Sequence, residues 1–388
     1  MYISLDEMKR ASELTREGRL LEATRIIRQA LGETSATQPA SPGAAEVALP
    51  PGQHASGDSD ISDVEFRELP PSAHEVAPLL LPQREAARAQ PDRFRPASFE
   101  AHRFASNGRT HAYRLYVPPR SDDRLLPVIV MLHGCTQDAA DFAAGTAMNE
   151  LAAQRGCIVV YPEQLARSNS MRCWNWFDPS HQHRGRGEPA MIAALAADVV
   201  QRCEGDPSRV YVAGLSAGGA MAALVAQLYP DVFAAVGVHS GVPAGAATDV
   251  PSAHVAMRRP ARKPGAGATS LAVVPTIVFH GDSDRTVHPD NGCQLIAEAV
   301  ARATVSDIEL QPQEQCLTLA GRTVKRTIYH DPLQVPRLEH WEIADGTHAW
   351  SGGSADGSYT DPSGPSASAA MIDFFLAQQL APDAVRST

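Results

Sequence analysis

Three side chains with the chemistry of a serine hydrolase follow one another along the chain: Ser216, Asp284 and His348. A serine hydroxyl attacks a carbonyl carbon effectively only when a base removes its proton and an acid holds that base in one tautomer. Ser216 is the centre of the sequence G-L-S-A-G at 214–218, between the apolar run 209–213 and a helix-like stretch. This pattern is typical of a nucleophile elbow. The alternative is a plain strand-to-helix connection. The presence of an acid and a base further along the chain decides between the two interpretations.

The predicted acid lies on a loop that follows a later strand, as an elbow of this type requires. The apolar run 275–280 indicates a buried strand, and the loop after it carries two carboxylates, Asp282 and Asp284. Asp282 comes directly after a glycine, where a short carboxylate commonly binds its own turn. We therefore assign the catalytic role to Asp284.

The predicted base is His348, in a glycine-containing loop after the alternating run 337–343. Among 14 histidines most are expected on the surface or in the core, so chain order is used to choose one. His340 alternates within a strand, His330 ends one, and His288 is too close to Asp284 in sequence to reach the elbow. Only His348 remains on a loop after the last strand.

Acyl transfer also needs backbone donors aimed at the oxygen where negative charge develops. Ala217, directly after the nucleophile, is expected to provide one N–H, and Cys135, after the strand-like run 127–132, the other. A thiol nucleophile at Cys135 would leave Ser216 without a role. A disulfide or small apolar packing at Cys135 remains open.

An aromatic cluster, C-W-N-W-F at 173–177, stands out in a chain with 6% aromatic residues. We expect Trp174 and Trp176 to form an apolar substrate wall, and Trp350, two residues after the base, to line the same cleft. Burial in the core is the alternative for all three residues.

Five motifs occur in a fixed order, at residues 131–137, 161–164, 173–177, 214–221 and 280–287. Together they resemble the polyhydroxybutyrate depolymerase family of esterases, from about Phe99 to Phe375. The resemblance implies an α/β-hydrolase fold and hydrolysis of short-chain hydroxyalkanoate esters, with Ser216, Asp284 and His348 as the triad. It also implies kinship with feruloyl and acetylxylan esterases.

One departure from the family affects the expected substrate. Secreted depolymerases that attack solid polymer carry a linker and a polymer-binding module after the catalytic portion, whereas this sequence stops soon after a helix-like stretch at 364–380. We therefore expect soluble oligomers or small esters as substrates, with no cofactor and no metal. The alternatives are a feruloyl or acetylxylan esterase, a peptidase or acyltransferase, and a non-catalytic interaction protein with the same fold.

Composition narrows the classes of partner and compartment. The chain has 388 residues and a net charge of −10, which disfavours nucleic acid and anionic membrane surfaces as partners. No apolar run approaches the roughly 18 residues of a membrane helix. The N-terminus lacks the pattern of a secretory signal, so we expect a cytoplasmic protein, with an extracellular one as the alternative. Six cysteines without a C-x-x-C spacing disfavour zinc and leave their redox state open.

The elements expected to position these residues divide the chain into three parts. Residues 1–32 have a capping box and helical periodicity, and we expect a helical hairpin that docks on a partner protein or is a plain surface hairpin. Residues 33–95 are rich in Pro, Ala and Ser and predict a flexible linker. Residues 96–382 predict the catalytic domain, a mostly parallel sheet with helices on both faces that begins with two antiparallel strands. Residues 244–270 could cover the site as a lid or form a solvent-facing connection.

Overall fold

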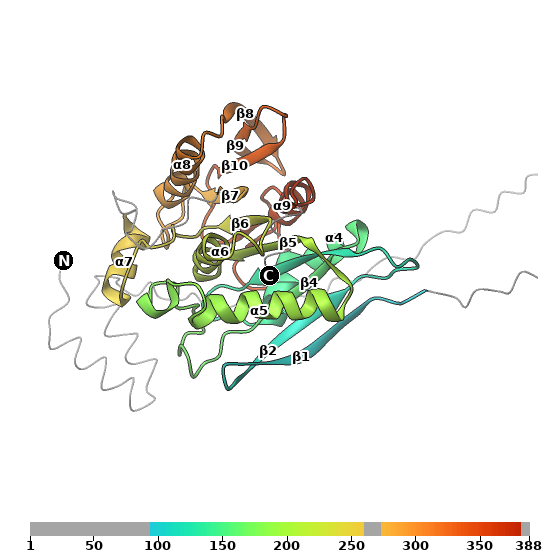
Figure 1. Cartoon of the computed structure of the whole chain (residues 1–388). Helices are drawn as coiled ribbons and strands as arrows, with labels where there is room; N and C mark the ends of the chain where they lie inside the picture. The colour runs from blue at the N-terminus through green and yellow to red at the C-terminus, as the bar shows by residue number, and fades with distance from the viewer. Residues whose placement is uncertain (1–93, 260–272, 382–388) are drawn as a thin grey trace, which may run out of the picture. The chain divides into compact units, whose positions relative to one another are not determined.

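A computed structural model describes residues 94–259 and 273–381 of the chain. The predicted hairpin at 1–32 and nearly all of the predicted linker at 33–95 lie outside the described residues, so those two predictions stay untested. The described residues contain a ten-stranded sheet whose strands lie in the order β1-β2-β4-β3-β5-β6-β7-β10-β9-β8 (Figure 1). A two-stranded sheet, β11-β12, is separate from it.

Nine of the ten strands of the main sheet are five to nine residues long, and β5 has eleven. Their bounds are β1 Ser98–Ser106, β2 Arg109–Val117, β3 Leu126–Leu132, β4 Ile158–Pro162, β5 Gly205–Leu215, β6 Ala235–His239, β7 Thr276–Gly281, β8 Gln311–Leu319, β9 Arg322–His330 and β10 Pro336–Ile343. The short pair is β11 Trp350–Ser351 and β12 Thr360–Asp361.

Six adjacent strands, from β4 to β10 in the sheet order, are parallel to one another. Every residue of β3, β4, β6 and β7 is buried, as expected for strands covered by helices on both faces. The strands β1 and β2 pair antiparallel. Both the mostly parallel sheet and its antiparallel start are therefore confirmed.

Helices cover both faces of the sheet, and the alternation along each strand divides the core into two halves. Val128, Val130 and Leu132 of β3 pack in one half, with α5, α6 and α8, while Ile129 and Met131 pack in the other, with α3, α4 and α9. The helix bounds are α3 Ala139–Thr146, α4 Met148–Arg155, α5 Gly187–Arg202, α6 Ala217–Leu228, α7 Val250–Arg258, α8 Asp290–Val305 and α9 Ala367–Leu376. A 3-10 turn, η1, spans Pro179–His181.

Two elements differ from the sequence expectation. The strands β8 and β9 form an antiparallel hairpin beside β10, whereas the sequence analysis placed only the end of a strand, at His330, in this region. β8 is largely exposed and gives no apolar run, although Val324, Thr327 and Ile328 of β9 are buried. The remaining signal is the two-residue turn at Ala320 and Gly321, both with positive φ. The described part of 244–270 contains the helix α7, which begins at the capping residue Asp249.

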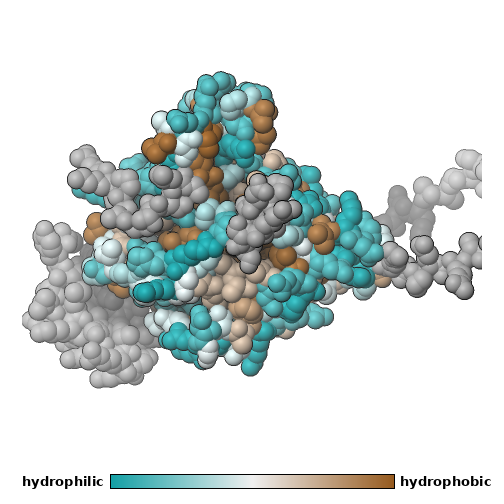
Figure 2. Space-filling view, viewed as in Figure 1, coloured by the Kyte–Doolittle hydropathy of each residue, from teal (hydrophilic) through white to brown (hydrophobic). Residues whose placement is uncertain are grey.

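The face of the molecule in Figure 2 is mostly hydrophilic, with separate hydrophobic patches. This agrees with the abundance of charged side chains and the net charge of −10. In the part of the chain that the structure describes, no helix has the length and apolar character needed to span a membrane.

Candidate active site

The elbow is a sharp turn between β5 and α6, and Ser216 occupies it with φ 57° and ψ −120°. Such a backbone is costly for a residue with a side chain and persists only where neighbours enforce it. A Cβ at Gly218 would lie 2.1 Å from the carbonyl oxygen of Leu132, so only glycine fits there. The Ser216 N–H donates a hydrogen bond of 2.9 Å to the carbonyl of His239, at the end of β6. The neighbouring strand ends therefore fix the nucleophile backbone.

Asp284 and His348 are directly paired, with 2.7 Å between Asp284 Oδ2 and His348 Nδ1. The other oxygen of Asp284 accepts the N–H groups of Thr286 at 2.8 Å and Val287 at 2.9 Å. Burial alone would raise the pKa of the Asp284 carboxyl, but hydrogen bonds from His280, His348 and the Val287 N–H lower that pKa well below its usual range. The ionised carboxylate accepts from Nδ1–H of His348, which leaves Nε2 of the ring available as a base.

Asp282 has the structural role that was predicted for it, but a different partner. Its Oδ1 accepts the N–H of Asp345, on the loop that carries His348, at 2.8 Å. The expected contact with its own turn is instead made by Asp284, whose Oδ1 accepts from the two amides of its own loop. Both carboxylates therefore contribute to holding the acid and base loops together.

Ser216 and His348 line one pocket of about 510 Å³, together with Cys135 and Ala217. The described residues provide no acceptor for the backbone N–H of either Cys135 or Ala217, so both donors are available to a ligand. No hydrogen bond joins the Ser216 hydroxyl to His348 within the described ranges. Catalytic hydrogen bonds in unliganded sites often form only when substrate binds.

Cys135 and Cys173 form a disulfide, which is one of the alternatives that the sequence left open for Cys135. The bond ties the loop after β3 to the aromatic loop at 163–178. Both cysteines line the pocket. The remaining cysteines in the sequence, at 157, 203, 293 and 316, are free thiols.

The predicted aromatic wall is correct for Trp176 and wrong for Trp174 and Trp350. Trp176 lines the pocket. Trp174 is fully buried in the core, with its ring 5.7 Å from that of His133. Trp350 is also fully buried, and its indole N–H donates to Ser368 Oγ at 3.0 Å. Burial in the core, the alternative stated for these residues, holds for all three, because Trp176 is buried in the core as well as lining the pocket.

The sequence analysis missed most of the apolar wall. A wide set of apolar side chains surrounds the nucleophile. They come from the aromatic loop, the segment after β6, α7, the acid loop and the residue before β12: Met171, Phe177, Val242, Val250, Ala253, Met257, Val287 and Tyr359. None of these residues belongs to a periodic sequence pattern that would predict its place beside the elbow. The helix start at Asp249-Val250-Pro251 was the available signal that α7 is an ordered element rather than a loop.

Two buried histidines at strand ends were also missed. His280, the penultimate residue of β7, has Nε2 at 3.5 Å from Asp284 Oδ2 and donates from it to the carbonyl of Val287 at 2.9 Å. His239 ends β6 and contacts both the elbow and the strand β11. A histidine at the end of an apolar strand is the signal that could have identified both residues.

One group of described residues has the spacing of metal ligands: Cys293, His340 and Glu342, with ligand atoms within 4.8 Å of one another. None of them lines the Ser216 pocket. The Lys325 ammonium already lies 3.6 Å from the Glu342 carboxylate and competes with a cation there. We assign no metal to this group.

Comparison with known proteins agrees with this geometry. The esterase PHB depolymerase family model matches residues 111–308. Poly(3-hydroxyalkanoate) depolymerase C of Paucimonas lemoignei is 40% identical over 182 residues, which cover 44% of this chain and 44% of that protein. Feruloyl esterase B of Thermothelomyces thermophilus is 32% identical over 255 residues, which cover 61% of this chain and 84% of the esterase.

The fold also matches a solved structure. An acetyl xylan esterase from Aspergillus awamori superposes with a TM-score of 0.57 at 21% identity, over 72% of this chain and 99% of that one. This likeness concerns the fold alone. The matched family model, the two relatives and the fold lead to one conclusion: the chain belongs to the PHB depolymerase family of esterases and has the α/β-hydrolase fold.

Proposed function

We propose that the chain is a serine carboxylesterase that hydrolyses short hydroxyalkanoate esters and oligomers through an acyl-enzyme. The observation that carries this proposal is the 2.7 Å pair of Asp284 and His348 beside a pocket that Ser216 and His348 both line. A partly buried, oriented imidazole in the same pocket as a serine on an elbow is the arrangement that activates a hydroxyl for acyl transfer.

In the first step His348 takes the hydroxyl proton while Ser216 Oγ bonds to the ester carbonyl carbon. The N–H groups of Cys135 and Ala217 stabilise the negative oxygen of the tetrahedral intermediate. Its collapse breaks the ester C–O bond, and His348 returns the proton to the leaving alcohol. Water then attacks the acyl-enzyme with His348 as base, which releases the acid and restores Ser216. Asp284 stays ionised throughout and holds the imidazole in the productive tautomer.

The pocket lining supports an uncharged, apolar ester. No Asp, Glu, Lys or Arg is among the described residues that line it, and its walls include Trp176, Phe177 and Met257. A charged acyl group would lose its hydration there without gaining an ion pair. Short hydroxyalkanoate units have the small apolar bodies and single hydroxyl groups that this lining accommodates.

The test is a substrate panel with a Ser216→Ala variant as the control for chemistry. Purified protein is assayed on p-nitrophenyl butyrate and on soluble 3-hydroxybutyrate oligomers. We expect kcat to fall by roughly 10⁶-fold in Ser216→Ala, since a nucleophile lost from a triad removes most of its catalysis. Ser168→Ala is the matched control, because Ser168 is in the aromatic loop but outside the pocket. Near-normal turnover by Ser216→Ala would overturn the proposal.

A feruloyl esterase is the second candidate, because feruloyl esterase B is matched over 84% of its length. Methyl ferulate and acetylated xylan in the same panel separate the candidates by kcat/KM. A fluorophosphonate probe tests the non-catalytic alternative. Labelling of the wild type but not of Ser216→Ala is expected, and an unlabelled wild type would favour an interaction protein.

A further inference from the structure

His239 occupies a position between the nucleophile and the base loop that the mechanism above does not use. It is the last residue of β6, and its ring is almost completely buried. The ring is stacked against Phe279, with centroids 5.8 Å apart, and against Trp350, with centroids 5.1 Å apart. Because the imidazole is packed against both of these aromatic rings, it has little freedom to rotate.

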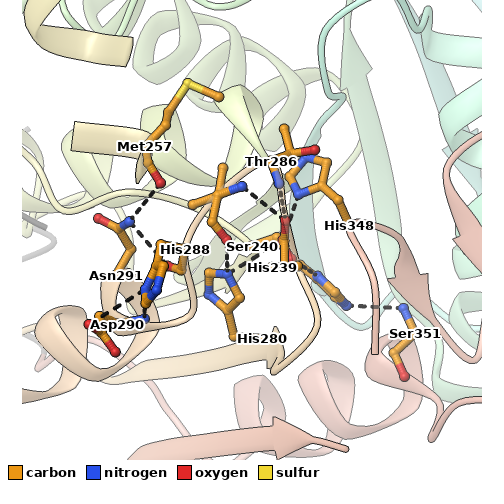
Figure 3. A network of polar contacts seen from close by, with 12 residues as sticks. His239, Ser240, Met257, His280, Thr286, His288, Asp290, Asn291, His348 and Ser351 are labelled. Carbon is orange, nitrogen blue, oxygen red and sulfur yellow. Dashed lines mark hydrogen bonds and ion pairs between the residues drawn. The ribbon is translucent and has the colours of Figure 1, made fainter. Parts of the chain in front are cut away.

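The same residue makes two hydrogen bonds that lead to the two reacting groups. Its carbonyl oxygen accepts the N–H of Ser216 at 2.9 Å. Its Nε2 accepts the N–H of Ser351, three residues after His348, at 3.0 Å (Figure 3). One residue therefore joins the elbow to the C-terminal side of the base loop.

These contacts are compatible with a single protonation state. A backbone N–H can only donate, so Nε2 of His239 must carry the lone pair, and the proton sits on Nδ1. Nδ1 then donates to Ser240 Oγ, at 3.2 Å. Burial, together with the neighbouring His280 and His348, lowers the pKa of His239 to about 3, so the ring stays neutral at working pH.

The base loop is also held at its two ends, where the N–H of Ala344 donates to the carbonyl of Thr323 at 2.9 Å and the N–H of Trp350 donates to the carbonyl of Tyr359 at 2.7 Å. Two further bonds come from the acid side. Asp282 accepts the N–H of Asp345 at 2.8 Å, and the N–H of Ser283 donates to the carbonyl of Gly346 at 3.0 Å. Those bonds set His348 relative to Asp284. They do not fix the position of His348 relative to Ser216, because Ser216 follows a different strand, β5.

We propose that His239 is a positioning residue that sets the distance and direction between His348 and Ser216 through its imidazole bond to Ser351. The proposal rests on the function proposed above. Misplacement of a catalytic group by about 1 Å can reduce a rate on the order of 100-fold, so loss of this bond acts on kcat. Substrate contacts in the pocket are untouched, because His239 does not line it.

The test compares two replacements of His239 that remove different properties. His239→Phe keeps the aromatic stack and removes the acceptor, whereas His239→Gln loses the ring and can place an oxygen near the Nε2 position. We expect kcat for p-nitrophenyl butyrate to fall about 10- to 100-fold in His239→Phe, with KM within about twofold. We expect His239→Gln to retain at least about a third of wild-type kcat. Equal losses, or a more active Phe variant, would overturn the proposal.

Phe279→Leu is the matched control for packing. It weakens the stack on His239 without touching the bond to Ser351, so a lower melting temperature with kcat within about threefold is expected. If kcat follows the melting temperature across all three variants, the role is merely structural and the proposal fails.

A measurement on the wild type does not depend on the folding of any variant. Imidazole ¹⁵N shifts, assigned by their loss in His239→Gln, should show a neutral ring protonated on Nδ1 at pH 7. An Nε2–H tautomer would overturn the proposal, because that nitrogen could not accept from Ser351. The Ser216→Ala assay keeps the two questions apart. Loss of activity there with wild-type kcat in His239→Phe rejects only the positioning role.

Discussion

The acid–base side of the site and the apolar wall of the same pocket are built in opposite ways. On the acid–base side Asp284 is buried and every oxygen of its carboxylate is hydrogen-bonded. On the wall, Met171, Val250 and Tyr359 are about half exposed. The chemistry is thus fixed by strand ends, whereas the groups that meet the substrate are provided by surface loops and the short helix α7. We infer that specificity can change in this fold without disturbing the triad.

The buried side has a second layer of polar groups that the wall lacks. His280 donates from Nε2 to the carbonyl of Val287 and lies beside the Asp284 carboxylate. Its Nδ1 is buried and has no partner among the described residues. The imidazole is therefore held through Nε2 alone.

The largest effect within this comparison is expected from Asp284→Asn. An amide can present the wrong partner to Nδ1 of His348 and favour the unproductive tautomer, as the corresponding change does in serine proteases. We expect kcat on p-nitrophenyl butyrate to fall about 10³- to 10⁴-fold, with KM little changed. Steady-state kinetics at pH 7 measure both constants.

Asp282→Asn is the matched control for this change. Asn keeps a side-chain oxygen that can accept the N–H of Asp345, and Asp282 does not contact His348. We expect kcat within about threefold of wild type, since a neutral hydrogen bond replaces a charge-assisted one. A larger loss in Asp282→Asn than in Asp284→Asn would reverse the assignment of the acid.

A smaller effect is expected where the two sides meet, at the Cys135–Cys173 disulfide. The bond connects the proposed oxyanion donor to the aromatic loop of the wall. Losing an oxyanion donor outright costs about 10²- to 10³-fold in kcat, so loosening it in Cys135→Ala/Cys173→Ala should cost about tenfold. Because disulfides persist in oxidising compartments, we propose the extracellular alternative over the cytoplasm.

Cys316→Ser provides the control for this double variant. Cys316 is an exposed free thiol on β8 and is not among the residues that line the pocket. Its kcat should equal that of the wild type, with and without reductant in the assay. An unchanged kcat in the double variant would show that the disulfide does not hold the Cys135 amide in place.

The same difference between the two sides explains what could be predicted from the sequence. Asp284 and His348 follow apolar strands, so periodicity and chain order located them, and the structure pairs them. The wall has no such periodicity. Trp174 and Trp176 are two residues apart and both are buried in the core, yet only Trp176 also lines the pocket, because the loop that carries them has neither helical nor strand regularity.

The β8–β9 hairpin was missed for a related physical reason. It lies at the edge of the sheet, and no residue of its outer strand β8 is buried, so this strand has no hydrophobic periodicity in its sequence. His239 and His280 could have been found as polar ends of apolar strands, but their partners come from loops about 110 and only 7 residues away, respectively. Contacts of that kind depend on tertiary structure, which local patterns do not encode.

The smallest effect is expected from the wall, with Met257→Ala on α7. The end of this helix is held through main-chain atoms, since the carbonyl of Met257 accepts the N–H of His288 at 2.7 Å and the side-chain amide of Asn291 at 3.4 Å (Figure 3). The side chain can therefore be shortened without releasing the helix. We expect the ratio of kcat/KM for p-nitrophenyl octanoate to that for the butyrate to rise several-fold, up to about tenfold.

Val255→Ala tests whether this shift comes from the pocket or from the helix. Val255 is on α7 too, but it is 64% exposed and does not line the pocket, so its removal should leave the ratio unchanged. An equal shift in both variants would mean that α7 acts through its mobility. An unchanged ratio in Met257→Ala would place the acyl chain along the aromatic loop instead. Met171, Trp176 and Phe177 would then be the side chains that limit the length of the acyl group.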